Sequence, residues 1–145
     1  MKKFSFSLET ARKWRERQAE IEEVRLQALF AEKRAMEDRA VSLQTELEAE
    51  HRRIEDTSFD AGELARLDDF QVWVTREKRR LGTSLSECEQ RIEARRAALV
   101  EARRRFQLVD RLKEKALLEW RKTSEKEQED LAAELYLARR TRHDG

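Results

Sequence analysis

The sequence predicts an all-α protein, an antiparallel two-helix coiled-coil hairpin with a longer C-terminal helix. The chain of 145 residues contains no proline, and 43% of its residues are Asp, Glu, Lys or Arg. That composition suits long solvated helices better than a compact core built around a sheet. Apolar residues also recur in alternating steps of three and four, as they do in a coiled-coil seam. One turn signal separates two such stretches, and we therefore expect two helices that form a single domain over residues 1–145.

The first helix is predicted over about residues 8–56. Ser7 is suited to cap it, and Glu9 places a negative charge in the first turn, where the helix dipole favours one. The apolar spacing is regular in the second half of this helix and less regular in the first half. The predicted stripe consists of Ala11, Trp14, Ile21, Ala28, Met36, Ala40, Leu43, Leu47 and Ile54, with Glu50 as a polar member.

A turn is predicted at about residues 57–62, and the second helix at about residues 63–142. Asp60 followed by Glu63 matches the capping-box pattern at a helix start. The three-four alternation in this helix is almost unbroken, and Cys88 falls on it, which predicts a small buried side chain rather than a reactive thiol. The predicted seam is Val74, Lys78, Leu81, Leu85, Cys88, Ile92, Arg95, Leu99, Ala102, Phe106, Val109, Lys113, Ala116 and Trp120.

A short turn between two such helices favours antiparallel packing. With the turn centred near Asp60, residue i should face a residue near 120 minus i, which sets Trp14 beside Phe106 and Leu47 beside Trp73. At about 1.5 Å per residue, the first helix would measure roughly 70 Å and the second roughly 120 Å. About 25 residues of the second helix should therefore extend beyond the start of the first.

The sequence lacks the signals that are typical of several other classes of protein. Cys88 has no second cysteine, and His51 and His143 stand apart from other ligand residues, so neither a disulfide nor a metal site is expected. The sequence has no Gly-rich phosphate loop, and a two-helix hairpin offers no deep pocket. We therefore expect no enzyme activity and no cofactor. The net charge of +1, with acids interleaved throughout, argues against nucleic-acid binding. The sequence also has no transmembrane segment and no secretory signal pattern, so we expect a cytoplasmic protein.

Charge varies along the predicted hairpin. Residues 1–20 hold six basic and three acidic side chains, and residues 103–126 hold nine and four, which gives net charges of +3 and +5. Residues 21–57 hold six and ten, a net charge of −4. Three interpretations of the basic end remain open: a solvated helix face, a binding surface for an acidic protein partner, and a membrane-surface helix.

Four stretches together resemble the FliJ family of flagellar export proteins and, more distantly, the stalk proteins of virulence type III secretion systems. They are "KKFSFSLETARKWRERQAE", "LARLDDFQVWV", "CEQRIEARRAALVEARRRFQLVDRLKEKALLEW" and "EKEQEDLAAELYLARR". The resemblance covers most of the chain. It implies an antiparallel coiled coil, similar to the central shaft of rotary ATPases, that acts at the inner face of the cell membrane.

The resemblance further implies that the protein binds a hexameric export ATPase and promotes its assembly and activity. It also implies contacts with the export gate, a membrane protein, and with substrate chaperones. Phe70 and Trp73 are the expected gate contacts, although packing of Trp73 over Leu47 is an equal alternative. The alternative functions are a structural scaffold coiled coil and a stalk protein of a virulence system. The residues expected to bind the ATPase are Arg103, Arg104, Arg105, Arg121, Lys122, Leu131 and Leu135.

Overall fold

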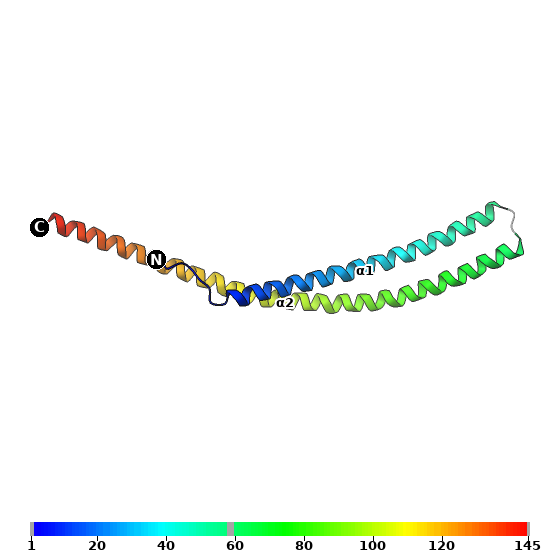
Figure 1. The fold of residues 1–145 in the computed structure, drawn as a ribbon, viewed down its shortest axis with the longest axis horizontal. Helices are drawn as coiled ribbons and strands as arrows, with labels where there is room; N and C mark the ends of the chain where they lie inside the picture. The colour runs from blue at the N-terminus through cyan, green and yellow to red at the C-terminus, as the bar shows by residue number, and fades with distance from the viewer. Residues whose placement is uncertain (1, 58–59, 145) are drawn as a thin grey trace. The chain divides into compact units, whose positions relative to one another are not determined.

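The structure, a computed structural model, describes residues 2–57 and 60–144 and contains two α-helices (Figure 1). Helix α1 spans Glu9–Asp56 and has 48 residues, and helix α2 spans Ala61–His143 and has 83 residues. Within the described ranges no strand is present. The predicted fold class is therefore confirmed: the protein is all-α, and its two packed helices form a hairpin in which the C-terminal helix is the longer one.

Contacts divide the chain into two compact units, which we describe separately. The hairpin unit comprises Glu20–Val100 and contains most of α1 and the first half of α2. The terminal unit comprises Met1–Ala19 and Glu101–Gly145, of which residues 2–19 and 101–144 are described.

The two helices of the hairpin unit lie side by side in opposite directions, with α1 in blue to cyan and α2 in green in Figure 1. The Cys88 thiol donates to the carbonyl oxygen of Leu29 at 3.5 Å, and Arg91 Nη2 lies 3.2 Å from Glu32 Oε1. Each observed partner is within one helical turn of the position expected from the rule that residue i faces a residue near 120 minus i. The antiparallel register predicted from the turn is thus confirmed in this unit.

The seam predicted for α2 is also confirmed. None of its fourteen members is exposed, and Val74, Cys88, Ile92 and Leu99 are buried. The buried residues of α1 are Leu26, Leu43, Leu47 and Ile54.

Two of the basic seam residues pair with polar side chains across the hairpin unit. Lys78 donates from Nζ to Gln44 Oε1, and Arg95 Nη1 lies 3.4 Å from Glu22 Oε2. Long basic side chains can occupy such positions because their apolar stems pack while their charged heads reach the edge of the interface.

The first half of α1 differs from the prediction. Ala11, Trp14 and Ala28 are exposed, so their assignment to the seam was wrong. The inward residues follow the three-four spacing extrapolated backward from Met36, which places Leu29 and Leu26 inward. The next inward positions upstream are Glu22, Ala19, Arg15 and Arg12, none of which is exposed. The three-four spacing of inward positions continues through polar residues such as Glu22 and Arg12. The prediction instead assigned nearby apolar residues to the seam.

The start of α2 supports the capping prediction but moves the helix boundary. The Asp60 carboxylate accepts a hydrogen bond from the Glu63 amide at 2.8 Å, as an N-cap residue does. Helix α2 accordingly begins at Ala61 rather than near residue 63. Of the predicted turn, Ser58 and Phe59 lie outside the described residues. At the other helix start, the Glu9 amide donates to the Phe6 carbonyl oxygen at 3.1 Å, and α1 begins at Glu9.

The enclosure of Leu43 predicts a large stability cost for its truncation. Leu43 is 0% exposed and packs in a cluster with Leu47 and Val74. Leu43→Ala should lower the free energy of unfolding by about 2–5 kcal/mol, because it leaves a cavity in the seam. The same substitution at Leu137, which is 59% exposed, should change it by less than about 0.5 kcal/mol. Urea unfolding followed by circular dichroism measures both values, and equal costs at the two sites would contradict the packing.

Candidate partner-binding surfaces

The most exposed part of the described chain is residues 125–144, the last stretch of α2 together with Asp144, which we name the C-terminal arm. Every residue of the arm is exposed. Leu131 and Leu135 are 57% and 58% exposed. Together with Ala138 they follow the i, i+4, i+7 spacing that places residues on one helix face. The structure thus presents both predicted apolar site residues as one solvent-facing stripe.

Charge within the C-terminal arm separates along its length. Residues 125–134 contain five acidic side chains and one lysine, a net charge of −4, whereas residues 139–142 contain three arginines and no acid. A helix that packs along the apolar stripe would meet both signs of charge. The arm therefore adds an acidic section beyond the basic stretch of residues 103–126.

The five basic residues predicted to bind the ATPase lie in the terminal unit, and all are exposed. Two of them are held by a nearby carboxylate: Glu101 lies 2.7 Å from Arg104 Nη2 and 3.1 Å from Arg105 Nε. These hydrogen bonds, first from Arg104 and then from Arg105, lower the pKa of Glu101 from 4.5 to about 2. Glu101 therefore offsets part of the positive charge at this point of α2. The remaining residues of the set are Arg103, Arg121 and Lys122.

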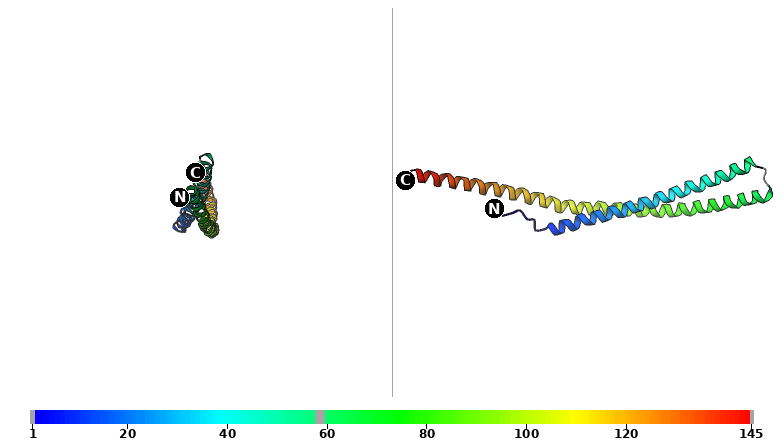
Figure 2. Two further views of the ribbon diagram at one scale, coloured as in Figure 1. Left: turned by 90° about the vertical axis from the view of Figure 1, so that its right-hand side faces the viewer. Right: turned by 45° about the horizontal axis from the view of Figure 1, so that its top comes forward.

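The segment that precedes α1 packs on α2 in the terminal unit (Figure 2). The Phe4 ring lies 5.9 Å from the Trp120 ring at an interplanar angle of 59°. Trp120 is half-buried, as predicted for a seam residue. Trp14, by contrast, is 53% exposed, and the Arg15 guanidinium lies 4.8 Å from the centre of its ring. The predicted packing of Trp14 beside Phe106 is therefore wrong.

Arg12 occupies the place beside Phe106 instead. Its guanidinium lies 5.3 Å from the centre of the Phe106 ring, and its Nε lies 2.9 Å from Asp110 Oδ1. One turn earlier in α1, Glu9 Oε2 lies 2.9 Å from Lys113 Nζ. The hydrogen bond from Lys113 is the main cause that lowers the pKa of Glu9. These contacts make a polar interface where the sequence interpretation expected an apolar seam.

The two aromatic residues near the turn have different environments. The rings of Phe70 and Trp73 stack at 5.9 Å with an interplanar angle of 20°. Phe70 is half-buried and packs against the cluster that contains Leu43 and Val74, whereas Trp73 is 41% exposed. Of the two, Trp73 is the better placed to contact a partner.

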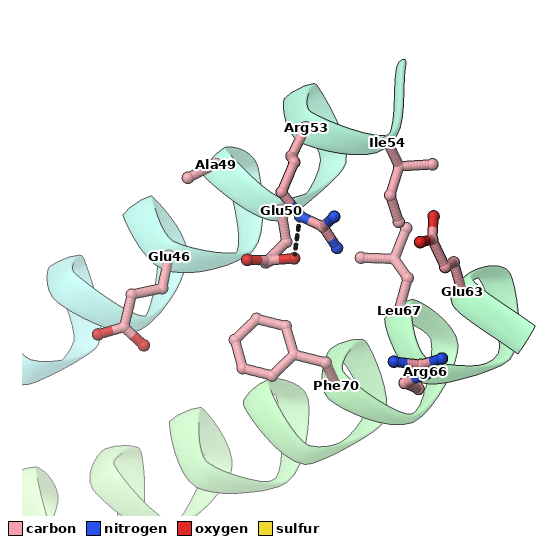
Figure 3. A pocket seen from close by; sticks show the side chains of 9 residues that line it. All are labelled: Glu46, Ala49, Glu50, Arg53, Ile54, Glu63, Arg66, Leu67 and Phe70. Carbon is pink, nitrogen blue, oxygen red and sulfur yellow. Dashed lines mark hydrogen bonds and ion pairs between the residues drawn. The ribbon is translucent and has the colours of Figure 1, made fainter. Parts of the chain in front are cut away.

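A hollow of about 520 Å³ opens between the end of α1 and the start of α2 in the hairpin unit (Figure 3). Its apolar lining comes from Ala49, Ile54, Leu67 and Phe70, and the Phe70 ring points across it towards α1. An ion pair in which Arg53 Nε lies 3.1 Å from Glu50 Oε2 stands at its edge. No sequence motif predicts this hollow, because it arises where the two helices approach the turn. The other lining residues are Glu46, Glu63 and Arg66.

The described residues form neither a metal site nor a membrane-spanning helix. Among residues 2–57 and 60–144, no group of three or more His, Cys, Asp and Glu is arranged to hold a metal ion. No helix of the part that the structure describes is long and apolar enough to cross a membrane.

Comparison of this chain with protein families, with curated proteins and with solved structures finds no match.

The contrast between Phe70 and Trp73 predicts that the two truncations differ. Trp73→Ala should leave the melting temperature nearly unchanged, because the side chain is 41% exposed and does not pack against the cluster that contains Leu43. Phe70→Ala should cost roughly 1–3 kcal/mol, since the ring is half-buried against the apolar cluster. Thermal unfolding of the two single variants measures this difference. A loss of stability in Trp73→Ala as large as that in Phe70→Ala would show that Trp73 is part of the core.

The low pKa of Glu101 predicts how its carboxyl group titrates. Because the folded pKa lies below the usual 4.5, the ion pairs with Arg104 and Arg105 should be fully formed above pH 4.5 and should be lost as the pH falls towards about 2. In the double variant Arg104→Gln, Arg105→Gln, the pKa should return towards 4.5. An NMR titration of the carboxyl carbon measures both values. A titration of Glu101 near 4.5 in the unmodified protein would contradict the contacts.

Proposed function

We propose that this chain is a non-enzymatic stalk protein of the flagellar type III protein export apparatus. In this role it binds the hexameric export ATPase, promotes its assembly and activity, and couples it to the export gate at the inner face of the cell membrane. The observation that carries the proposal is the C-terminal arm, a stretch of helix that is exposed over residues 125–144. The arm has the form of a docking element.

The apolar stripe of the C-terminal arm supports a binding role. Helices gain most of their stability in proteins by packing an apolar face against another element. Leu131 and Leu135 share one face and remain more than half exposed, and Tyr136 is 65% exposed on a neighbouring face. A partner that buries these side chains would gain apolar contact and would also hold the arm in its helical form.

The choice of a ring-shaped ATPase as the partner rests on the resemblance to FliJ proteins, with charge and geometry as support. A helix whose sides are all exposed can be enclosed by several subunits at once. Arg121 and Lys122 precede the arm, and residues 125–134 carry a net charge of −4. We therefore expect a partner that presents basic groups to the acidic section and acidic groups to the arginines and lysines.

Trp73 supports the second part of the proposal, the contact with the export gate. The indole is 41% exposed and is supported from one side by the stacked Phe70 ring. Large aromatic side chains with one covered and one open face often serve as anchors at protein interfaces. Substrate chaperones are further partners in this proposal, which assigns them no residues.

A structural scaffold coiled coil and a virulence type III stalk protein are the alternative functions. A scaffold protein would use its exposed apolar residues for packing into a larger filament, without any effect on an ATPase. A virulence stalk would act on the ATPase of an injectisome rather than on a flagellar one. Mixing the chain with each candidate ATPase, and following ring assembly and ATP turnover, separates these functions.

The C-terminal arm should be required for stimulation but not for folding. Truncation after Ser124 keeps the contact between Phe4 and Trp120, and all the described residues that it removes, 125–144, are exposed. The truncated protein should unfold at nearly the same temperature as the full chain and should no longer stimulate the ATPase. Stimulation by the folded truncation would place the contact elsewhere.

A matched pair of substitutions tests the stripe itself. Leu131→Asp should weaken binding to the ATPase roughly tenfold or more, because it places a charge at the centre of the proposed contact. Leu137→Asp introduces the same charge at a similarly exposed leucine on another face of the helix, and it should have a much smaller effect. Fluorescence anisotropy of labelled protein measures both affinities.

A further inference from the structure

The N-terminal arm, which we define as residues 2–19, lies on α2 without a buried apolar layer. All eight buried side chains of the described chain belong to the hairpin unit. In the terminal unit, no residue of the described ranges 2–19 and 101–144 is buried. Apolar burial therefore contributes much less to the attachment of the N-terminal arm than to the pairing of the helices in the hairpin unit.

Two ion pairs help to attach the arm to α2. Arg12 pairs with Asp110 and Glu9 pairs with Lys113, each at 2.9 Å. The four side chains are between 21% and 32% exposed, although the paired oxygen Glu9 Oε2 is itself shielded from solvent. Ion pairs of this kind contribute little individually, and salt screens them.

We propose that residues 2–19 form a detachable arm, which leaves α2 while the hairpin unit stays folded and thereby exposes a binding face for a partner helix. The face consists of Phe106 and Val109 with Asp110 and Lys113 beside them. Opening also uncovers Trp120, against which Phe4 packs. The arm itself defines the chemistry of its replacement: a helix with a carboxylate facing Lys113 and a cation facing Asp110 and the Phe106 ring.

The inference adds a second docking face to the C-terminal arm and does not depend on the identity of its partner. Local openings of a protein range from nearly free at weakly packed ends to as costly as global unfolding in the core. The N-terminal arm resembles the weakly packed ends, because no residue of the arm is buried and its ion pairs are formed by partly exposed side chains. The cluster of Leu43, Leu47 and Val74 belongs to the core.

Amide hydrogen exchange in the full chain tests the opening. Amides of residues 12–19 should exchange at least roughly tenfold faster than those of residues 43–54, and the ratio should rise when salt is increased from about 0.1 M to about 1 M. Over that range the screening length falls from about 10 Å to about 3 Å, which weakens the two ion pairs. Equal protection of the two segments, or a ratio that salt does not change, would overturn the proposal.

A peptide of residues 2–19, added to the full chain, tests the exposed face. Arg12→Glu places a carboxylate against Asp110 and should loosen the chain's own arm, so this variant should bind the labelled peptide roughly tenfold more tightly than the unmodified chain. Arg91→Glu breaks an exposed pair with Glu32 in the hairpin unit and should leave peptide binding unchanged. Failure of Arg12→Glu to strengthen binding would contradict a replaceable arm, as would an equal gain in both variants.

Discussion

Burial of one narrow row of apolar side chains between α1 and α2 is the interaction on which the rest of the structure depends. Three members of this row, Leu43, Val74 and Cys88, are almost completely shielded from solvent. A pair of helices can bury only one stripe from each, and all other positions face solvent. This constraint explains how a chain that is 43% charged can still form a defined fold. It also limits the well-packed region to the hairpin unit, which contains every buried side chain of the described residues.

Both candidate docking elements belong to the terminal unit, which has no buried residue in its described ranges 2–19 and 101–144. Ion pairs and ring contacts attach the N-terminal arm to α2, whereas every residue of the C-terminal arm is exposed. Stability therefore decreases from the hairpin unit to the arms, as expected when packing and not helix propensity supplies most of the free energy. Segments with low local stability are the ones that a partner can rearrange at small cost.

The fold and the second seam could be predicted because the three-four spacing from Val74 to Trp120 is nearly unbroken. In the first half of α1 the helix was predicted correctly, but the seam was predicted wrongly at Ala11, Trp14 and Ala28, because Arg12 occupies an inward position while the apolar Trp14 is exposed. Extrapolating the three-four spacing strictly from Met36 would have identified Arg12 as an inward residue. The exposure of Leu131 followed from the unequal helix lengths. No periodic signal predicts the contact between Phe4 and Trp120, since the segment before α1 is not helical.

Amide hydrogen exchange of the chain, free and in complex with the candidate export ATPase, tests most directly the claim that the C-terminal arm is the docking element. In the free protein, residues 125–144 should exchange rapidly, because no other part of the described chain covers them. In the complex, their exchange should slow strongly, while the hairpin unit around Leu43 should change little. Unchanged exchange of residues 125–144 in a complex that has formed would contradict this account.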